Sequence, residues 1–193
     1  PVFPTPTIGM VGRMEDLNLK TAIGFQNEGD IIYLLGHSKN DIAGSEYLSN
    51  ILNIKASPAP YFDIEEEKLL HKAIYDLIRK KLLTSCHDVS DGGLFTSLME
   101  SAYVHEKGFE IKTDADLRKD AFLFGEAQGR AIISIRPNQV EALESYCQSL
   151  GLNISKLGEV KAKQVIIDNQ NYGFVSEYKK LHLESLENRI AAK

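Results

Sequence analysis

The stretch Leu82–Leu94, with the sequence LLTSCHDVSDGGL, decides how the rest of the chain is interpreted. It begins with a short apolar run, passes through a polar turn with two acids and a histidine, and ends in two glycines that open a helical pattern. This order predicts a strand, a turn and a helix. Such a junction can hold an anion, because unpaired backbone N–H groups point outward at the start of a helix. Two stretches of similar shape lie at 4–12 (PTPTIGMVG) and 123–130 (LFGEAQGR).

The composition is that of a soluble globular chain with one core. The chain has 193 residues, of which 43% are hydrophobic and 25% charged. Its net charge of −5 leaves no basic footprint, so neither nucleic acid nor an anionic membrane is expected as a partner. Cys86 and Cys147 lie far apart without a CxxC motif, which favours free thiols in the cytoplasm. No apolar run approaches the roughly 18 residues of a membrane span, and no signal peptide is visible.

Hydrophobic patterns predict alternating strands and helices. The apolar runs Ile31–Leu35 (IIYLL) and Ala131–Ile135 (AIISI) predict buried strands. Asp63 predicts the N-cap of a helix that extends to 81, since three glutamates fill its first turn and apolar residues recur three and four apart. Further helices are expected at 44–54, 94–107 (closed by Gly108), 120–124, 137–150 (closed by Gly151) and 176–191, and further strands at 109–111, 154–160 and 165–167.

These elements predict an α/β (α+β) sandwich, with one mixed sheet and helices packed against it. Residues 27–193 are expected to form this compact domain. Residues 1–26 are expected to be a strap from a preceding domain, because prolines hold 1–12 in extended geometry, as an edge strand or a strap. The chain begins without Met, and we expect it to be a fragment of a longer polypeptide.

The first candidate site is the turn at 87–93. Asp88 and Asp91 are candidate metal ligands, because Mg²⁺ prefers one or two carboxylates together with water and phosphate oxygens. Gly92 and Gly93 allow a ligand to approach the backbone closely, as a phosphate-binding turn requires. The structural alternative is favoured on sequence alone: Asp91 caps the following helix and the glycines only make the turn. His87 is more typical of a structural hydrogen bond than of a general base.

The second candidate site is the glycine-bounded loop 125–130. Arg130 is suited to a bidentate phosphate contact, and Glu126 and Gln128 to hydrogen bonds with ligand hydroxyls. The alternative is a surface loop with an Arg–Glu pair. The chain has neither a Walker loop nor a GxGxxG motif, and no Cys/His cluster has metal-ligand spacing.

Together these motifs resemble the C-terminal part of the phosphoribosylformylglycinamidine synthase family, within the aminoimidazole ribonucleotide synthetase-like superfamily. PTPTIGMVG at 4–12 is similar to the end of that enzyme's second ATP-binding-type domain, and GDIIYLLG at 29–36 to the first strand of its final domain. The family's remaining motifs follow in order: Gly44-Ser45-Glu46-Tyr47, HDVSDGGL at 87–94 and LFGEAQGR at 123–130. The resemblance implies the fold of the C-terminal domain of aminoimidazole ribonucleotide synthetase.

The resemblance also implies a function. The full enzyme of this family is an ATP-dependent ligase of purine biosynthesis, which converts formylglycinamide ribonucleotide to the amidine with glutamine-derived ammonia. It implies ATP and Mg²⁺ as cofactors of the full enzyme, and three partners: the preceding domains of the same polypeptide, a glutaminase subunit or domain, and the ribonucleotide substrate. Most nucleotide-binding residues of the family precede this region.

One departure from the family pattern concerns the second candidate loop. The family's first half has Glu-Ser-Gln where this chain has Glu126-Ala127-Gln128, so a hydroxyl is missing. The loop is therefore expected to serve an auxiliary site, with no catalytic residue of its own, and the fragment to be inert alone. Two alternatives stay open: an enzyme of the aminoimidazole ribonucleotide synthetase type, and a non-catalytic scaffold or interaction domain.

Overall fold

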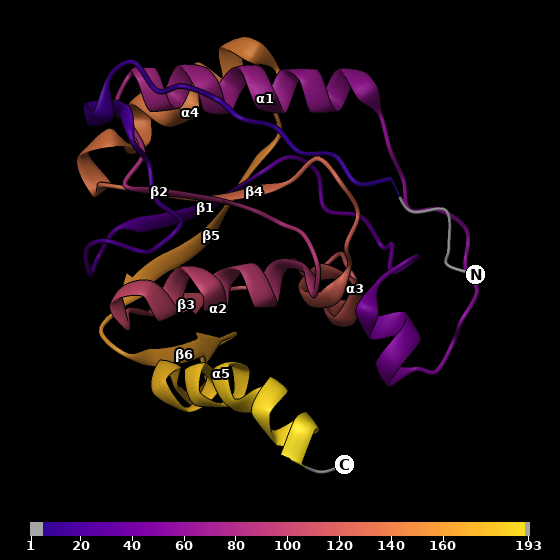
Figure 1. The fold of residues 1–193 in the computed structure, drawn as a ribbon. Coiled ribbons are helices and arrows are strands. Elements are labelled where there is room, and N and C mark those ends of the chain that lie inside the picture. Colours follow the sequence, from indigo (N-terminus) through magenta and orange to yellow (C-terminus); the bar gives the residue numbers. More distant parts are fainter. Residues whose placement is uncertain (1–5, 192–193) are drawn as a thin grey trace.

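The computed structural model describes residues 6–191, which form one seven-stranded sheet with helices on both faces (Figure 1). The strand order is β2-β4-β1-β5-β3-β6-β7, and every neighbouring pair is antiparallel except β3 and β6. The strands are β1 (Ile31–Leu35), β2 (Ser85–Asp88), β3 (Gly108–Ile111), β4 (Ala131–Ile135), β5 (Ile154–Lys161), β6 (Gln164–Ile167) and β7 (Gln170–Phe174). This architecture confirms the predicted mixed sheet with packed helices.

The helices divide between the two faces of the sheet. Five α-helices are present in the described part of the chain: α1 (Ile64–Arg79), α2 (Gly93–His105), α3 (Lys119–Phe124), α4 (Val140–Leu150) and α5 (Val175–Ala191). Figure 1 shows α1 and α4 on one face, and α2, α3 and α5 on the other. Three single turns complete the list: η1 (Leu17–Leu19), η2 (Tyr47–Ile51) and η3 (Pro137–Gln139).

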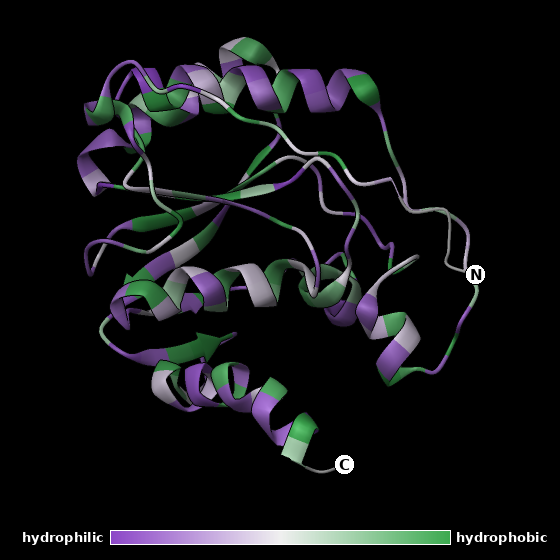
Figure 2. Ribbon diagram, viewed as in Figure 1, coloured by the Kyte–Doolittle hydropathy of each residue, from purple (hydrophilic) through white to green (hydrophobic). Residues whose placement is uncertain are grey.

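Alternation along the interior strand β1, which lies between β4 and β5, produces two separate cores. Tyr33 and Leu35 pack beneath α1 and α4, whereas Ile32 and Leu34 pack against the α2 face. All four side chains are at most 1% exposed, as expected for a strand that is covered on both faces. In Figure 2, α1 alternates between hydrophilic and hydrophobic colours along its length, which matches a helix with a single buried face.

Local capping signals are confirmed at α1 and α4. The Asp63 side chain accepts hydrogen bonds from the N–H groups of Glu65 and Glu66, at 2.8 and 3.1 Å. These two bonds hold the pKa of Asp63 below its usual value, with Glu66 the larger cause. Gly151 ends α4 in the left-handed conformation, with φ of 68°.

Two other predicted caps are wrong. Glu106, not Gly108, takes the left-handed position after α2, with φ of 50°. Gly108 instead begins β3, where an added Cβ would lie 2.1 Å from the carbonyl oxygen of Gln164 on β6. Asp91 does not cap α2, because the N-cap is Gly92 with φ of 80° and no side-chain hydrogen bond.

Two element predictions also need correction. The helix expected at 44–54 is a single π-helical turn, η2, in which Leu48 is buried while Ile51 and Leu52 are 66% and 42% exposed. Strand β7 was not predicted, because its sequence QNYGF is polar and contains glycine. Its pairing with β6 forms it despite this weak local preference.

The leading segment is extended but forms no strand within residues 6–16. Ile8, Met10 and Val11 are each more than 80% exposed, and the first five residues, including part of the PTPTIGMVG motif, lie outside the described range. Further along, Ala22 accepts a hydrogen bond from the N–H of Cys86, and Phe25 is fully buried in the core. The division at residue 26 stays a prediction. No helix within 6–191 is long and apolar enough to cross a membrane.

Candidate functional site

A single carboxylate joins three of the motifs. Oxygen Oε1 of Glu126 accepts hydrogen bonds from the backbone N–H of Gly92 at 2.8 Å and of Glu46 at 2.9 Å. These partners lie 34 and 80 positions away along the chain. The segments 44–47, 87–94 and 123–130 therefore meet beside α3 and the start of α2 (Figure 1). We call the Glu126 carboxylate and these two N–H groups the Glu126 clamp.

Two glycines allow the segments around the clamp to touch. Gly93 has φ of 70°, and a Cβ at this position would lie 2.7 Å from the carbonyl oxygen of Gly125. A Cβ on Gly125 would in turn lie 2.4 Å from the carbonyl oxygen of Asp41. Any side chain at either position would push these backbones apart. The start of α2, the 125–130 loop and the segment at 41 thus form one closely packed junction.

Arg130 supports this junction from inside. Its side chain donates to the carbonyl oxygens of Gly125 at 2.6 Å and Ala127 at 3.1 Å, and the residue is only 4% exposed. Burial lowers the pKa of the guanidinium to about 10, and the nearby Asp41 carboxylate opposes this effect. Nε and Nη2 of Arg130 serve the loop's own carbonyls, and Nη1 donates to the Ser38 hydroxyl at 3.5 Å, so the guanidinium is held within the loop. The expected bidentate phosphate contact of Arg130 stays a prediction. The expected Arg–Glu surface pair is replaced by these internal bonds.

The remaining loop residues divide between interior and surface. Ala127 is buried at 4% exposure, so the position that carries Ser in the family's first half packs inward here. Gln128 is exposed at the outer side of the loop, where a ligand could reach its amide. Its proposed hydrogen bond to a ligand hydroxyl stays a prediction.

The other candidate residues lie in β2 and in the turn that follows it: His87 and Asp88 end the strand, and Asp91 lies in the turn. His87 is held between Glu100, at 2.9 Å from Nε2, and Asp88, at 3.1 Å from Nδ1, which is the structural role that the sequence favoured. The Asp88 side chain is 78% exposed and Asp91 is also exposed. Among residues 6–191, no group of three or more His, Cys, Asp and Glu side chains is placed to hold a metal ion. Mg²⁺ at Asp88 and Asp91 would need phosphate oxygens and water as further ligands, and this role stays a prediction.

The Glu46 N–H belongs to the site, although no side-chain pattern in the sequence indicates it. Its neighbour Ser45 is buried, donates to the carbonyl of Ile42 at 2.6 Å and accepts from the N–H of Leu48 at 3.1 Å. This turn presents the Glu46 N–H to Glu126. Only the family motif at 44–47 marked the segment, because a backbone donor leaves no trace in the side-chain pattern.

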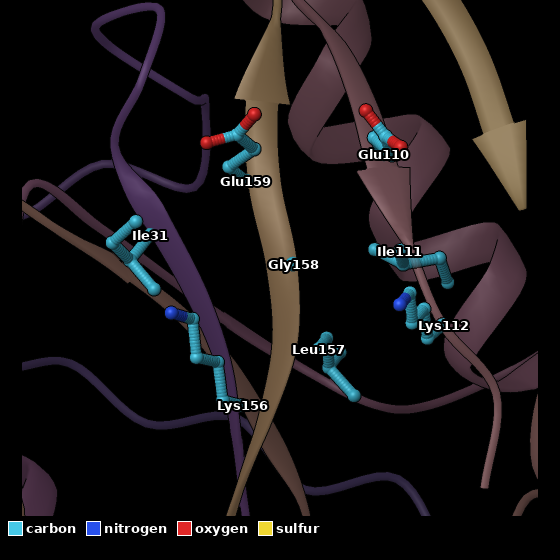
Figure 3. A pocket seen from close by; sticks show the side chains of 8 residues that line it. All are labelled: Ile31, Glu110, Ile111, Lys112, Lys156, Leu157, Gly158 and Glu159. Atoms are coloured by element: carbon cyan, nitrogen blue, oxygen red, sulfur yellow. The ribbon is translucent and has the colours of Figure 1, made fainter. Parts of the chain in front are cut away.

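Away from the clamp, a hollow of about 370 Å³ lies on the part of the sheet that α1 and α4 do not cover (Figure 3). Figure 3 shows Glu110 and Glu159 on neighbouring strands at one end of it. Lys161 pairs with both acids, at 3.0 Å from Glu110. Cross-strand ion pairs of this kind are typical of a sheet face that meets water. We therefore assign no ligand to this hollow.

Comparison with known proteins first identifies the class of domain. Residues 27–168 match the family described as AIR synthase related protein, C-terminal domain, and the chain belongs to this family. The matched region contains all three segments of the Glu126 clamp.

The similar curated proteins identify the resemblance more closely. The chain is 37% identical over 167 residues to phosphoribosylformylglycinamidine synthase subunit PurL of Caldanaerobacter subterraneus, a match that covers 86% of this chain and 23% of that protein. It is 38% identical to PurL of Synechocystis over 180 residues, or 91% of this chain and 23% of the relative. The chain thus spans about a quarter of the length of the curated relatives it matches.

Solved structures confirm the fold. Thermotoga maritima PurL complexed with FGAR superimposes with a TM-score of 0.72 at 17% identity, over 84% of this chain and 30% of that chain. Thiamine-monophosphate kinase from Stenotrophomonas maltophilia superimposes with a TM-score of 0.55 at 19% identity, over 78% and 53%. Both superpositions show the same fold.

Proposed function

We propose that the chain is the C-terminal part of a PurL-type synthetase, an ATP-dependent carbon–nitrogen ligase that converts formylglycinamide ribonucleotide to the amidine in purine biosynthesis. Three observations support this proposal: the family match over 27–168, the identity with several PurL subunits, and the order of the motifs. The observation that carries it is the Glu126 clamp, which brings these motifs into contact.

Within such an enzyme this domain has a structural role and supplies no catalytic groups. The side chains of Glu126 and Arg130 both form hydrogen bonds with the chain's own backbone. These bonds stabilise the loop and do not extend toward a substrate. Asp88, Asp91 and Gln128 are exposed polar residues near the clamp, and a ligand could reach them from outside. Alone, the chain is expected to be inert.

The remaining parts of the site would come from elsewhere in the enzyme. T. maritima PurL complexed with ATP and the PurLQS assembly of the same organism are among the similar structures, and they support ATP as cofactor and further subunits as partners. In this proposal the preceding domains hold ATP, Asp88 and Asp91 add carboxylates to a Mg²⁺ ion shared with its phosphates, and a glutaminase supplies ammonia. The biosynthetic relatives and the two free thiols support a cytoplasmic location.

The proposal is tested with a chimera. Petrotoga mobilis PurL is 35% identical to this chain over 193 residues, which is 26% of the relative, so the equivalent quarter can be exchanged for this chain. We expect the chimera to hydrolyse ATP only with formylglycinamide ribonucleotide and ammonia present, at a rate within tenfold of the parent. The isolated 193-residue chain should show no turnover. Activity with the amidine product as substrate instead would assign the chain to the aminoimidazole ribonucleotide synthetase type.

The chimera also tests the carboxylates. Asp88→Asn and Asp91→Asn should lower its turnover without changing its melting temperature, because both side chains are exposed and outside the clamp. Unchanged turnover in both variants would remove Asp88 and Asp91 from the site.

A further inference from the structure

A separate pocket of about 280 Å³ lies at the opposite end of β2 and β4 from the Glu126 clamp. It forms where η1, the end of α1, the residues before β2 and the junction of β4 with η3 come together (Figure 1). The clamp lies after the end of β2 and before the start of β4, whereas the pocket lies before β2 and after β4. The full length of both strands therefore separates the pocket from the clamp.

The lining of this pocket is basic and polar, although the chain as a whole is acidic. Three cations from three different segments line it, Lys20, Lys81 and Arg136, and no acid does. None of these three side chains belongs to an ion pair in the described part of the chain. The net charge of −5 makes such a concentration unexpected for an ordinary patch of this surface.

One acid near Lys81, Asp16, is hydrogen-bonded within a local turn. Asp16 accepts hydrogen bonds from the backbone N–H and the side-chain amide of Asn18, both at 2.9 Å. These bonds are the main reason why the pKa of Asp16 is lowered, and the charge of Lys81 contributes least. The Asp16 charge therefore acts on Lys81 from nearby, but Asp16 forms no ion pair with any of the three cations among the described residues.

Helix stabilisation explains only one of the cations. Lys81 follows α1, where a positive charge interacts favourably with the helix dipole. Its backbone is left-handed, with φ of 56°, a conformation that a glycine adopts more easily than a lysine. Lys20 and Arg136 come from other segments and have no such role at α1.

The donors in this pocket suit an oxyanion. A guanidinium can bind two oxygens of one phosphate through parallel N–H groups, and the two ammonium groups add charge. The hydroxyl of Thr21 and the amide of Gln139 provide neutral donors beside them. Two other polar groups of the lining have partners within the protein, since Asn18 donates to Asp16 and the Thr84 hydroxyl is paired with Ser134 at 2.7 Å. The volume lies just below the range of pockets that enclose drug-sized ligands, which indicates a small ligand.

We propose that this pocket binds the phosphate group of a small phosphorylated ligand, with Arg136, Lys81 and Lys20 as its cationic contacts. The proposal goes beyond the synthetase function proposed above and does not rest on it.

The test uses ¹H–¹⁵N spectra of the 193-residue chain during titration with inorganic phosphate at constant ionic strength, so that general screening is held fixed. We expect saturable shifts of the backbone amides at 19–21, 81–84 and 139, with no change at Glu46 or Gly92. Shifts that grow linearly without saturating, or that appear at the clamp instead, would overturn the proposal.

Two variants and a control separate binding from folding. Arg136→Gln and Lys81→Gly should each weaken phosphate binding at least tenfold, whereas Arg79→Gln, a neighbouring cation outside the pocket lining, should leave it unchanged. Lys81→Gly should also raise the melting temperature, since it relieves the left-handed lysine. A more stable protein that has lost phosphate binding cannot be explained by misfolding. Equal affinity in all three variants would refute the assignment.

A parallel titration with ribose 5-phosphate distinguishes the two sources of the group. Tighter binding of the sugar phosphate would support an organic ligand that also contacts Thr21 and Gln139, and equal affinity would support free phosphate. Absence of saturable binding for both would overturn the site.

Discussion

Removal of the Glu126 carboxylate should detach three segments from one another. Glu126→Ala leaves the N–H groups of Glu46 and Gly92 without their acceptor. A hydrogen bond to a charged group contributes about 1.5–3 kcal/mol when it is well buried. The Gly92 bond is partly buried and the Glu46 bond is exposed, so we assign them about 2 and about 1 kcal/mol respectively. The expected loss in the free energy of unfolding is therefore about 3 kcal/mol.

Urea denaturation and hydrogen exchange together measure this loss. With a slope of about 2 kcal/mol per M of urea, a loss of about 3 kcal/mol lowers the midpoint by about 1.5 M. Glu126→Gln keeps an oxygen acceptor but removes the charge, and should cost only about 1 kcal/mol. The amide protons of Glu46 and Gly92 should exchange faster in Glu126→Ala than in the parent chain.

Gln128→Ala is the matched control, because Gln128 lies in the same loop with its side chain exposed. It should change the free energy of unfolding by less than about 0.5 kcal/mol. If Glu126→Ala unfolds at the same urea concentration as Gln128→Ala, or if exchange at Glu46 and Gly92 is unaltered, the clamp does not hold the motifs together.

Three further predictions follow from the same junction and from the core. Gly93→Ala should lower the free energy of unfolding by at least about 3 kcal/mol, because the backbone there is left-handed and the added Cβ would lie within 3 Å of other backbone atoms. Gly151→Ala is the control: its backbone is also left-handed but its Cβ would meet open space, so it should cost only about 1 kcal/mol in thermal or urea unfolding. Arg130→Met should destabilise the chain by about 2–4 kcal/mol in urea, since it leaves two loop carbonyls without donors; an unchanged midpoint would show that the guanidinium is dispensable there. Burial raises the pKa of Cys86 and Cys147 to about 11, so at pH 8 about one thiol in a thousand is ionised, against about a quarter of free cysteine. Both cysteines should therefore react with a disulfide reagent roughly 250-fold more slowly than free cysteine until urea unfolds the chain.

The accuracy of sequence reasoning depended on how far apart the interacting groups lie. Asp63 and the glutamates of its first turn are neighbours, so their capping role could be read directly, and the structure confirms it. The sequence predicts Gly108 as a helix cap, because a glycine after a helix usually ends it. Its real constraint is the close approach of Gln164 on β6, which lies 56 positions later in the chain. A contact of that kind has no local signature.

Arg130 shows the same limit for chemistry. In sequence, a guanidinium in a glycine-rich loop indicates an anion ligand. Whether it points outward or inward depends on which carbonyls the folded loop turns toward it, and here Gly125 and Ala127 do so. Burial then fixes its role, because a desolvated cation must keep every hydrogen bond it has.

The sequence by itself determined the alternation of strands and helices and the positions of β1, β4 and α1, since each depends on residues within one turn or one strand. The order of its motifs along the chain also indicated the family. Only the tertiary structure decided that β1 lies between β4 and β5, that Glu126 binds the Glu46 and Gly92 backbones, and that Lys20, Lys81 and Arg136 share a pocket. These arrangements result from hydrogen bonds and packing between segments tens of residues apart. Their geometry exists only once the sheet has brought those segments together.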